Sequence, residues 1–107
     1  MKKYFFNKYK YKIVTKEKLK KILNSKLKNQ KSILCHGVFD VVHPGHVRHL
    51  AYAKSKADIL IVSLTSDIHI SKGTYRPHVP ENLRALNIAV FEMVDYVIID
   101  KNKTPLN

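Results

Sequence analysis

The chain has 107 residues, with 20 Lys and Arg against 8 Asp and Glu and a formal net charge of +12. Its hydrophobic fraction of 45% is ordinary for a globular protein and too high for a disordered tail. The length allows one small domain, and the single cysteine, Cys35, excludes an internal disulfide. We therefore expect a one-domain protein of a reducing compartment, the cytoplasm.

The positive charge is concentrated at the N-terminus. Residues 1–31 contain 12 lysines and one acid, a net +11, whereas residues 32–107 contain 8 Lys and Arg against 7 acids, a net +1. A basic segment can bind nucleic acid or anionic lipid, but a solvated lysine-rich surface explains it more simply. Nucleic acid is therefore not an expected partner. No apolar stretch approaches the roughly 18–20 residues of a membrane span.

The N-terminal third predicts an arm followed by a helix. Residues 1–14 alternate lysine and aromatic residues without a period, which indicates a basic, loosely ordered arm. Thr15 is a candidate N-cap for a helix within residues 15–29, with Glu17 in its first turn. The apolar positions of this helix fall on one stripe at Leu19, Ile22, Leu23 and Leu27.

The remaining residues, 32–107, predict the core of a single α/β domain. Short apolar runs indicate strands at 32–35, 59–64 and 96–99. Strands that alternate with helices predict right-handed βαβ units and a parallel, Rossmann-like sheet with helices on both faces.

Two helices are expected between these strands, over 46–56 and over 81–93, with Pro80 in the first turn of the second. The intervening residues 66–79 are polar and contain Gly and Pro, which predicts a loop. The expected inward positions are Val47, Leu50 and Ala51 on the first helix, and Leu83, Leu86, Asn87, Val90 and Phe91 on the second.

The loop from Gly37 to His46 carries the strongest chemical signal, because ligands of open parallel sheets bind outside the carboxyl ends of the strands. Gly37 and Gly45 allow tight turns and a close approach of the backbone to a ligand. His43 and His46 open a helix, where the dipole favours an anion, and both can donate to one phosphate. The structural alternative is a His pair that only caps the helix, and two histidines alone are a weak zinc signal.

Residues 37–46, Gly-Val-Phe-Asp-Val-Val-His-Pro-Gly-His, resemble the G-x-F-D-x-x-H-x-G-H signature of the cytidylyltransferase-like nucleotidyltransferases. Residues 12–19 resemble the leader helix of the heptose-1-phosphate adenylyltransferase domain. Further similar positions are Ser66-Asp67, Lys72-Gly73, Arg76-Pro77, Pro80, Arg84 and Val94-Asp95-Tyr96-Val97.

The resemblance implies an enzyme that transfers AMP or CMP from ATP or CTP to a sugar phosphate or polyol phosphate and releases pyrophosphate. Mg²⁺ would enter with the nucleotide phosphates, with no ion held directly by the protein. The runner-up within this superfamily is glycerol-3-phosphate cytidylyltransferase. The stretch Lys72-Gly73-x-x-Arg76-Pro77 favours the sugar branch.

The resemblance also implies roles for individual residues. His43, His46 and Lys72 are the expected catalytic groups, and the nucleotide would contact Gly37, Val38, Phe39, His43, Gly45 and His46. The expected groups at the acceptor phosphate are Asp40, Lys72, Arg76 and Arg84. Asp40 could instead support the loop or help to place Mg²⁺, Lys72 could be a plain surface lysine, and Asp67 is expected to organise its loop. The remaining histidines, at 36, 49, 69 and 78, are expected to be structural or solvated, and Cys35 an inert core residue.

Two features depart from the family pattern. Cys35-His36-Gly37 stands where the heptose enzymes usually read Thr-Asn-Gly. The sequence also stops before the further strands and the Ser/Thr-rich segment by which family members grip the nucleotide phosphates. We therefore expect either the N-terminal portion of a longer gene product or a C-terminally short, minimal domain whose crevice a homodimer or a partner protein would complete. In both cases the isolated chain is expected to be weakly active or inactive. A nucleotide-binding module without enzymatic activity is the alternative class.

Overall fold

Three parallel strands form the centre of the computed structural model, which describes residues 7–69 and 79–101. The strand order is β1-β2-β3, and Val62 lies opposite Cys35 on one side and Val97 on the other. The strands are β1 (Ser32–Gly37), β2 (Ile59–Thr65) and β3 (Tyr96–Asp100). All three predicted strands are confirmed, each extended by one or two residues at its carboxyl end.

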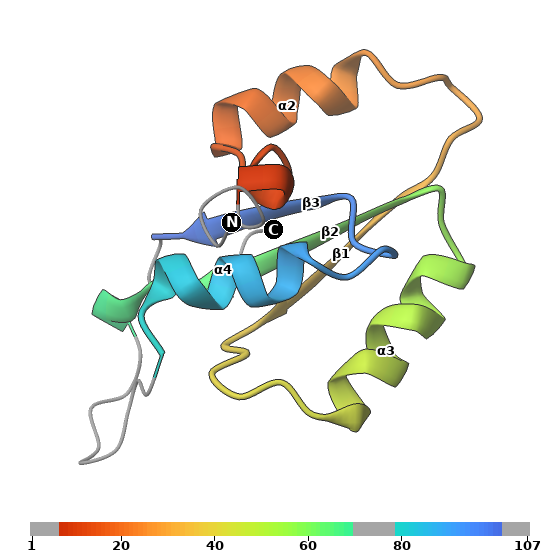
Figure 1. Ribbon diagram of the computed structural model, residues 1–107. Helices are drawn as coiled ribbons and strands as arrows, with labels where there is room; N and C mark the ends of the chain where they lie inside the picture. The colour runs from red at the N-terminus through yellow and green to blue at the C-terminus, as the bar shows by residue number, and fades with distance from the viewer. Residues whose placement is uncertain (1–6, 70–78, 102–107) are drawn as a thin grey trace.

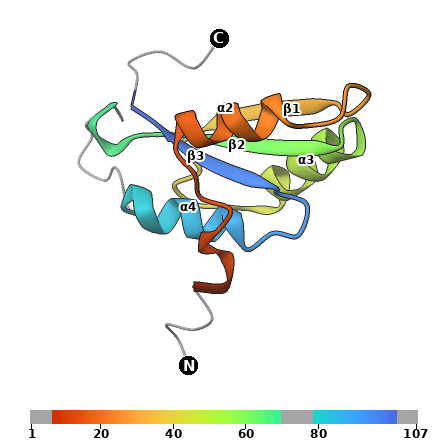
Figure 2. The same ribbon diagram turned by 90° about the horizontal axis from the view of Figure 1, so that it is seen from above.

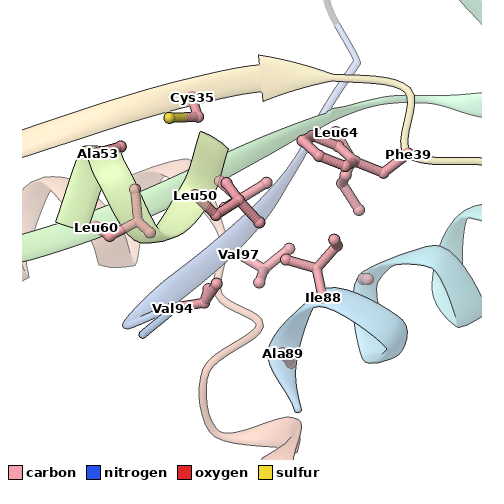
Figure 3. Close-up of a cluster of buried hydrophobic side chains, with 12 residues drawn as sticks. Cys35, Phe39, Leu50, Ala53, Leu60, Leu64, Ile88, Ala89, Val94 and Val97 are labelled. Carbon is pink, nitrogen blue, oxygen red and sulfur yellow. The ribbon is translucent and has the colours of Figure 1, made fainter. Parts of the chain in front are cut away.

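Helices cover both faces of this sheet, as Figures 1 and 2 show. The helices are α2 (Lys16–Asn24), α3 (Pro44–Ser55) and α4 (Glu81–Ala89). On the face of α2, Leu19 packs with Ile61 and Ile98. On the face of α3 and α4, a larger cluster surrounds Leu50 and Val62 and is drawn in Figure 3. The predicted α/β, Rossmann-like architecture is therefore confirmed.

Residues 7–14 differ from the loosely ordered arm predicted for residues 1–14, and residues 1–6 lie outside the described residues. Residues 7–10 are helical, and Ile13 pairs with Val97 in a parallel bridge at the outer edge of β3. Lys12 is buried, and its ammonium donates to the Phe91 carbonyl at 3.0 Å. Burial lowers the pKa of Lys12, against the raising effect of Asp95 and Glu92. The local sequence pattern could not predict these contacts, because they join residues more than 75 positions apart.

Helix α2 is shorter than the predicted 15–29. Thr15 caps it as expected, and its hydroxyl accepts from the Lys18 amide at 3.1 Å. The helix ends before Ser25, whose hydroxyl donates to the Ile22 carbonyl and so satisfies one of the last helical carbonyls. Leu27, predicted on the buried stripe, lies beyond the helix and is 66% exposed.

Helix α4 buries a different face from the one predicted by leucine spacing. The buried residues are Arg84, Ala85, Ile88 and Ala89, whereas Leu83 is 51% exposed. Alanines at 85 and 89 let the helix lie close to the sheet, and this close packing outweighs the larger side chain of Leu83. The helix also ends at residue 89 instead of 93.

The carboxyl ends of the strands gather at one edge of the sheet, at the left in Figure 1. The β1–α3 loop, the turn after β2 and the start of α4 all meet there. Within the described residues, β1 is an edge strand of the sheet. No helix among the described residues is long and apolar enough to span a membrane.

The two candidate faces of α4 are distinguished by a pair of truncations. We expect Ile88→Ala to lower the free energy of unfolding by about 2–5 kcal/mol, because it empties a fully buried site. Leu83→Ala on the exposed face should cost roughly 0.5 kcal/mol or less. Urea unfolding of both variants measures the difference. Equal losses would contradict the observed orientation of the helix.

Candidate nucleotide site

The turn after β1 contains an unusual backbone conformation at Phe39, and the ring of Phe39 lies close to Gly37. Phe39 has a φ of 51°, which is unusual for a residue with a side chain. Its ring folds back over Gly37, where an added Cβ would lie 2.7 Å from a ring carbon. Gly37 is therefore required by the close approach of the Phe39 ring, which is itself buried in the core with Leu64 and Leu50.

His43 and His46 cap the start of α3 reciprocally. The Nδ1 atom of His43 accepts from the Gly45 amide at 3.1 Å, and Nδ1 of His46 accepts from the His43 amide at 3.3 Å. This is a capping box built from two imidazoles in place of a hydroxyl and a carboxylate. The first turn of α3 contains no acidic residue, so the positive end of its dipole keeps no anionic side chain of its own.

The capping bonds determine which nitrogen of each ring carries the proton. A neutral imidazole that accepts at Nδ1 is protonated at Nε2, so both rings have an Nε2–H available as a donor. The ring centroids of His43 and His46 lie 3.9 Å apart, and the Phe39 ring lies 5.1 Å from that of His46. The turn thus packs against the His pair through one aromatic contact.

The position of His46 favours its neutral form. Burial lowers the pKa of His46 first, and the neighbouring charges that His43 and His49 would carry lower it further. A proton added at Nδ1 would also remove the acceptor for the His43 amide. His46 is therefore suited to hold an anion by hydrogen bonding as a neutral donor.

Asp40 and Arg84 are both brought to the turn, but both contact protein atoms. The Asp40 carboxylate is buried, and its Oδ1 accepts from the Val79 amide at 2.9 Å. Arg84 is fully buried and donates to the carbonyls of Val38, Thr65 and Val79. Their expected contacts with an acceptor phosphate stay predictions.

The turn after β2 contains a polar network that the sequence pattern did not predict, apart from an organising role for Asp67. Glu81 accepts from the Ser66 hydroxyl and from the Asp67 amide, both at 2.9 Å, and the Glu81 amide donates to Asp67 at 3.1 Å. Asp67 thereby caps α4, whose own N-cap, Pro80, offers no side chain for this purpose. These contacts fit the expected organising role of Asp67. The partners lie 14 or 15 residues apart, so no local spacing indicated them.

The other predicted residues are placed as follows. Lys72, Arg76 and His78 lie outside the described residues. His36 contacts the hydroxyls of Ser63 and Thr65 at 3.0 and 3.1 Å, which fits a structural role. Cys35 is buried in β1, and burial raises the pKa of its thiol, as expected of an inert core residue. The described residues hold no cluster of three groups that could ligate a metal.

The family model described as cytidylyltransferase-like matches residues 34–107 of the chain. This range includes both histidines, most of β1, all of β2 and β3, and the whole polar network. It agrees with the nucleotidyltransferase type of domain that the sequence signature indicates.

Two relatives named bifunctional protein HldE, from Campylobacter jejuni subsp. doylei and Helicobacter pylori, are each 43% identical over 97 residues. The matches cover 89% of this chain but 21% and 20% of those relatives, so the chain spans about a fifth of their length. Among solved structures, a lipopolysaccharide core biosynthesis protein from Thermoplasma volcanium matches with a TM-score of 0.59 and 29% identity. That match covers 68% of this chain and 60% of the other.

The contact between Gly45 and His43 can be tested by adding one methyl group. An added Cβ at position 45 would lie 2.8 Å from Cε1 of His43, so we expect Gly45→Ala to displace this ring and break the stack. The ring proton resonances of His43 and His46 should then move toward values typical of unstructured peptides. Pro44→Ala, the matched control, should leave them in place. Unchanged resonances in Gly45→Ala would contradict this packing.

The lowered pKa of His46 predicts a pH dependence of stability. The unfolded chain binds the proton more tightly, so this contribution is complete above about pH 6.5 and is lost as the pH falls below it. Urea unfolding between about pH 7.5 and pH 5.5 measures the slope. His46→Asn should flatten it, whereas His49→Asn, which removes only the smallest of the three causes of the lowered pKa, should flatten it less. An identical slope in wild type and His46→Asn would contradict the prediction.

Proposed function

Because the chain belongs to the cytidylyltransferase-like family, we propose that it forms a nucleotidyltransferase site. The reaction proposed is transfer of AMP or CMP from ATP or CTP to a sugar phosphate or polyol phosphate, with release of pyrophosphate. The residues that the sequence shares with the heptose-1-phosphate adenylyltransferase domain favour a heptose phosphate as the acceptor. As the chain spans about a fifth of the HldE relatives, this is a proposal for one catalytic unit and not for every activity of those proteins.

The observation that carries the proposal is the pair of Nε2–H donors at the start of α3. Both Nδ1 atoms accept from backbone amides, so each neutral ring has its remaining donor at Nε2. The helix dipole and the absence of a first-turn acid make this position favourable for a phosphate. A helix cap uses only the Nδ1 atoms, and a serine with a glutamate is the usual pair for this purpose. The Nε2–H donors of the two histidines are therefore not needed for the cap.

In the proposed mechanism, an oxygen of the acceptor phosphate attacks the α-phosphorus of the nucleotide. The bond from that phosphorus to the bridging oxygen breaks, and the electron pair leaves with pyrophosphate. Negative charge spreads over the phosphoryl oxygens during the transfer, and the Nε2–H groups of His43 and His46 would stabilise it. The backbone of Gly37, Val38 and Phe39 would hold the nucleotide.

Other groups of the proposed site have supporting roles. Lys72 and Arg76 would neutralise phosphate charge, as the resemblance implies. Mg²⁺ would enter as part of the nucleotide substrate, because hard cations bind phosphate oxygens readily. Asp40 does not fit a direct Mg²⁺ ligand in this arrangement, since its carboxylate is buried and bonded to the Val79 amide.

A second candidate is a nucleotide-binding module that completes its site only with another polypeptide. It is favoured by the edge position of β1 within the described sheet, because the ligand crevice of a doubly wound sheet lies between two strands. A homodimer or a partner protein would then supply the second wall.

The test is pyrophosphate release by the purified chain with Mg²⁺, ATP or CTP, and either heptose-1-phosphate or glycerol-3-phosphate. We expect His43→Ala and His46→Ala each to lower turnover by about 10²–10³-fold, because each removes a donor to the developing charge. Nucleotide affinity should fall less. His49→Ala, on the exposed side of the same helix, should retain activity.

The outcomes separate the two candidates. Nucleotide binding that needs both histidines but gives no turnover with any acceptor would favour the incomplete module. Turnover that is unaffected by either histidine change would overturn the proposed mechanism. Absence of both binding and turnover would overturn the proposed function.

A further inference from the structure

Arg84 joins three chain segments that meet at the carboxyl ends of β1 and β2. Its Nε donates to the Val79 carbonyl at 2.9 Å, and its Nη1 donates to the carbonyls of Val38 at 2.9 Å and Thr65 at 2.8 Å. The three carbonyls belong to the turn after β1, the last residue of β2 and the approach to α4. A rigid guanidinium fork can reach all three at once, which a single ammonium cannot.

The charge of Arg84 is compensated within the protein. Its Nη2 pairs with Oδ1 of Asp67, whose other oxygen accepts from the Glu81 amide. Four of the five N–H groups of the guanidinium are therefore directed at protein oxygens. The side chain is 0% exposed, in contrast to Arg48 on the surface of α3. In this arrangement the guanidinium is enclosed by the protein.

The turn after β1, to which Arg84 donates, contains a backbone conformation that is unfavourable by itself. Val38, whose carbonyl Arg84 binds, immediately precedes Phe39 with its φ of 51°. Such conformations persist only where the surroundings fix them. Asp40, the next residue, accepts from the Val79 amide while Arg84 binds the Val79 carbonyl. The turn is thus tied to one residue of the opposite segment, Val79, directly through Asp40 and indirectly through Arg84.

We propose that Arg84, with Asp67 as its counter-ion, is a positioning residue that fixes the Val38–Asp40 turn for nucleotide binding without contacting the phosphates. The inference deepens the proposed function and rests on it. Movement of the turn would also reach the His pair, because the Phe39 ring lies against His46. This role differs from the acceptor-phosphate contact that the sequence resemblance implies for Arg84.

Two conservative variants distinguish positioning from direct phosphate binding. Arg84→Lys keeps the positive charge and loses the fork, and Asp67→Asn keeps the shape of the counter-ion and loses its charge. If Arg84 positions the turn, both variants weaken binding of MgATP and MgCTP, with Arg84→Lys about tenfold or more, measured by titration calorimetry. If Arg84 instead binds phosphate directly, Asp67→Asn frees its guanidinium from the counter-ion, and the affinity for the nucleotide stays unchanged or rises.

A second readout reports the turn without any nucleotide. The Val79 amide donates to Asp40, so its hydrogen exchange should accelerate at least about tenfold in Arg84→Lys, and the ring resonances of His46 should shift. The Val97 amide, bonded to the Lys12 carbonyl at the far side of the sheet, should exchange as in wild type. Ala89→Gly is the control in the same helix, because it weakens the last residue of α4 and leaves the hydrogen bonds of Arg84 in place.

The outcomes test the proposed function and the positioning role of Arg84 separately. If wild type binds no nucleotide, the proposed function fails, and the exchange experiment still decides whether Arg84 fixes the turn. If wild type binds but Asp67→Asn binds equally well or better, or if Val79 exchange in Arg84→Lys matches that in Ala89→Gly, the positioning role is overturned. Should Arg84→Lys not fold, Asp67→Asn carries both measurements.

Discussion

The parallel pairing of β2 with both neighbours is the constraint on which the candidate site depends. From Leu60 to Leu64 every residue of β2 is buried, because helices cover both of its faces. Parallel pairing makes all three strands end at the same edge of the sheet. The loop after β1 and the turn after β2, distant in sequence, are therefore built on neighbouring strand ends, and both can contact the start of α4.

At this edge the same atoms serve folding and the proposed chemistry. The Nδ1 atoms of His43 and His46 cap α3, and that use leaves each Nε2–H as a donor of defined direction. Protonation of either ring would remove an acceptor from the cap, so the neutral form that holds the helix is also the form that presents a single donor. Gly45 is required in this arrangement because a side chain there would collide with the His43 ring. Helix stability and anion recognition are thus coupled through two side chains.

The buried charge of Arg84 explains why the turn keeps an unfavourable backbone conformation. A guanidinium removed from water must be compensated by nearby oxygens, and three carbonyls with one carboxylate do so here. The same contacts hold three segments in register. Asp67 has a double use, since it balances this charge and accepts from the first amide of α4. The network therefore replaces the helix cap that Pro80 does not offer.

The sequence by itself determined the strands, the order of elements, the parallel sheet and the His43–His46 loop, because hydrophobic runs, Gly and Pro positions and a short signature are local properties. It misplaced the end of α2, the buried face of α4 and the ordering of residues 7–14. The end of α2 is set locally, where the Ser25 hydroxyl donates to the Ile22 carbonyl. The other two features depend on contacts between distant residues: Ile13 with Val97 and Lys12 with the Phe91 carbonyl for residues 7–14, and Ala85 and Ala89 against the sheet for α4. Only the tertiary structure decided where Arg84 lies, because its burial requires oxygens from three separate segments to converge on one guanidinium.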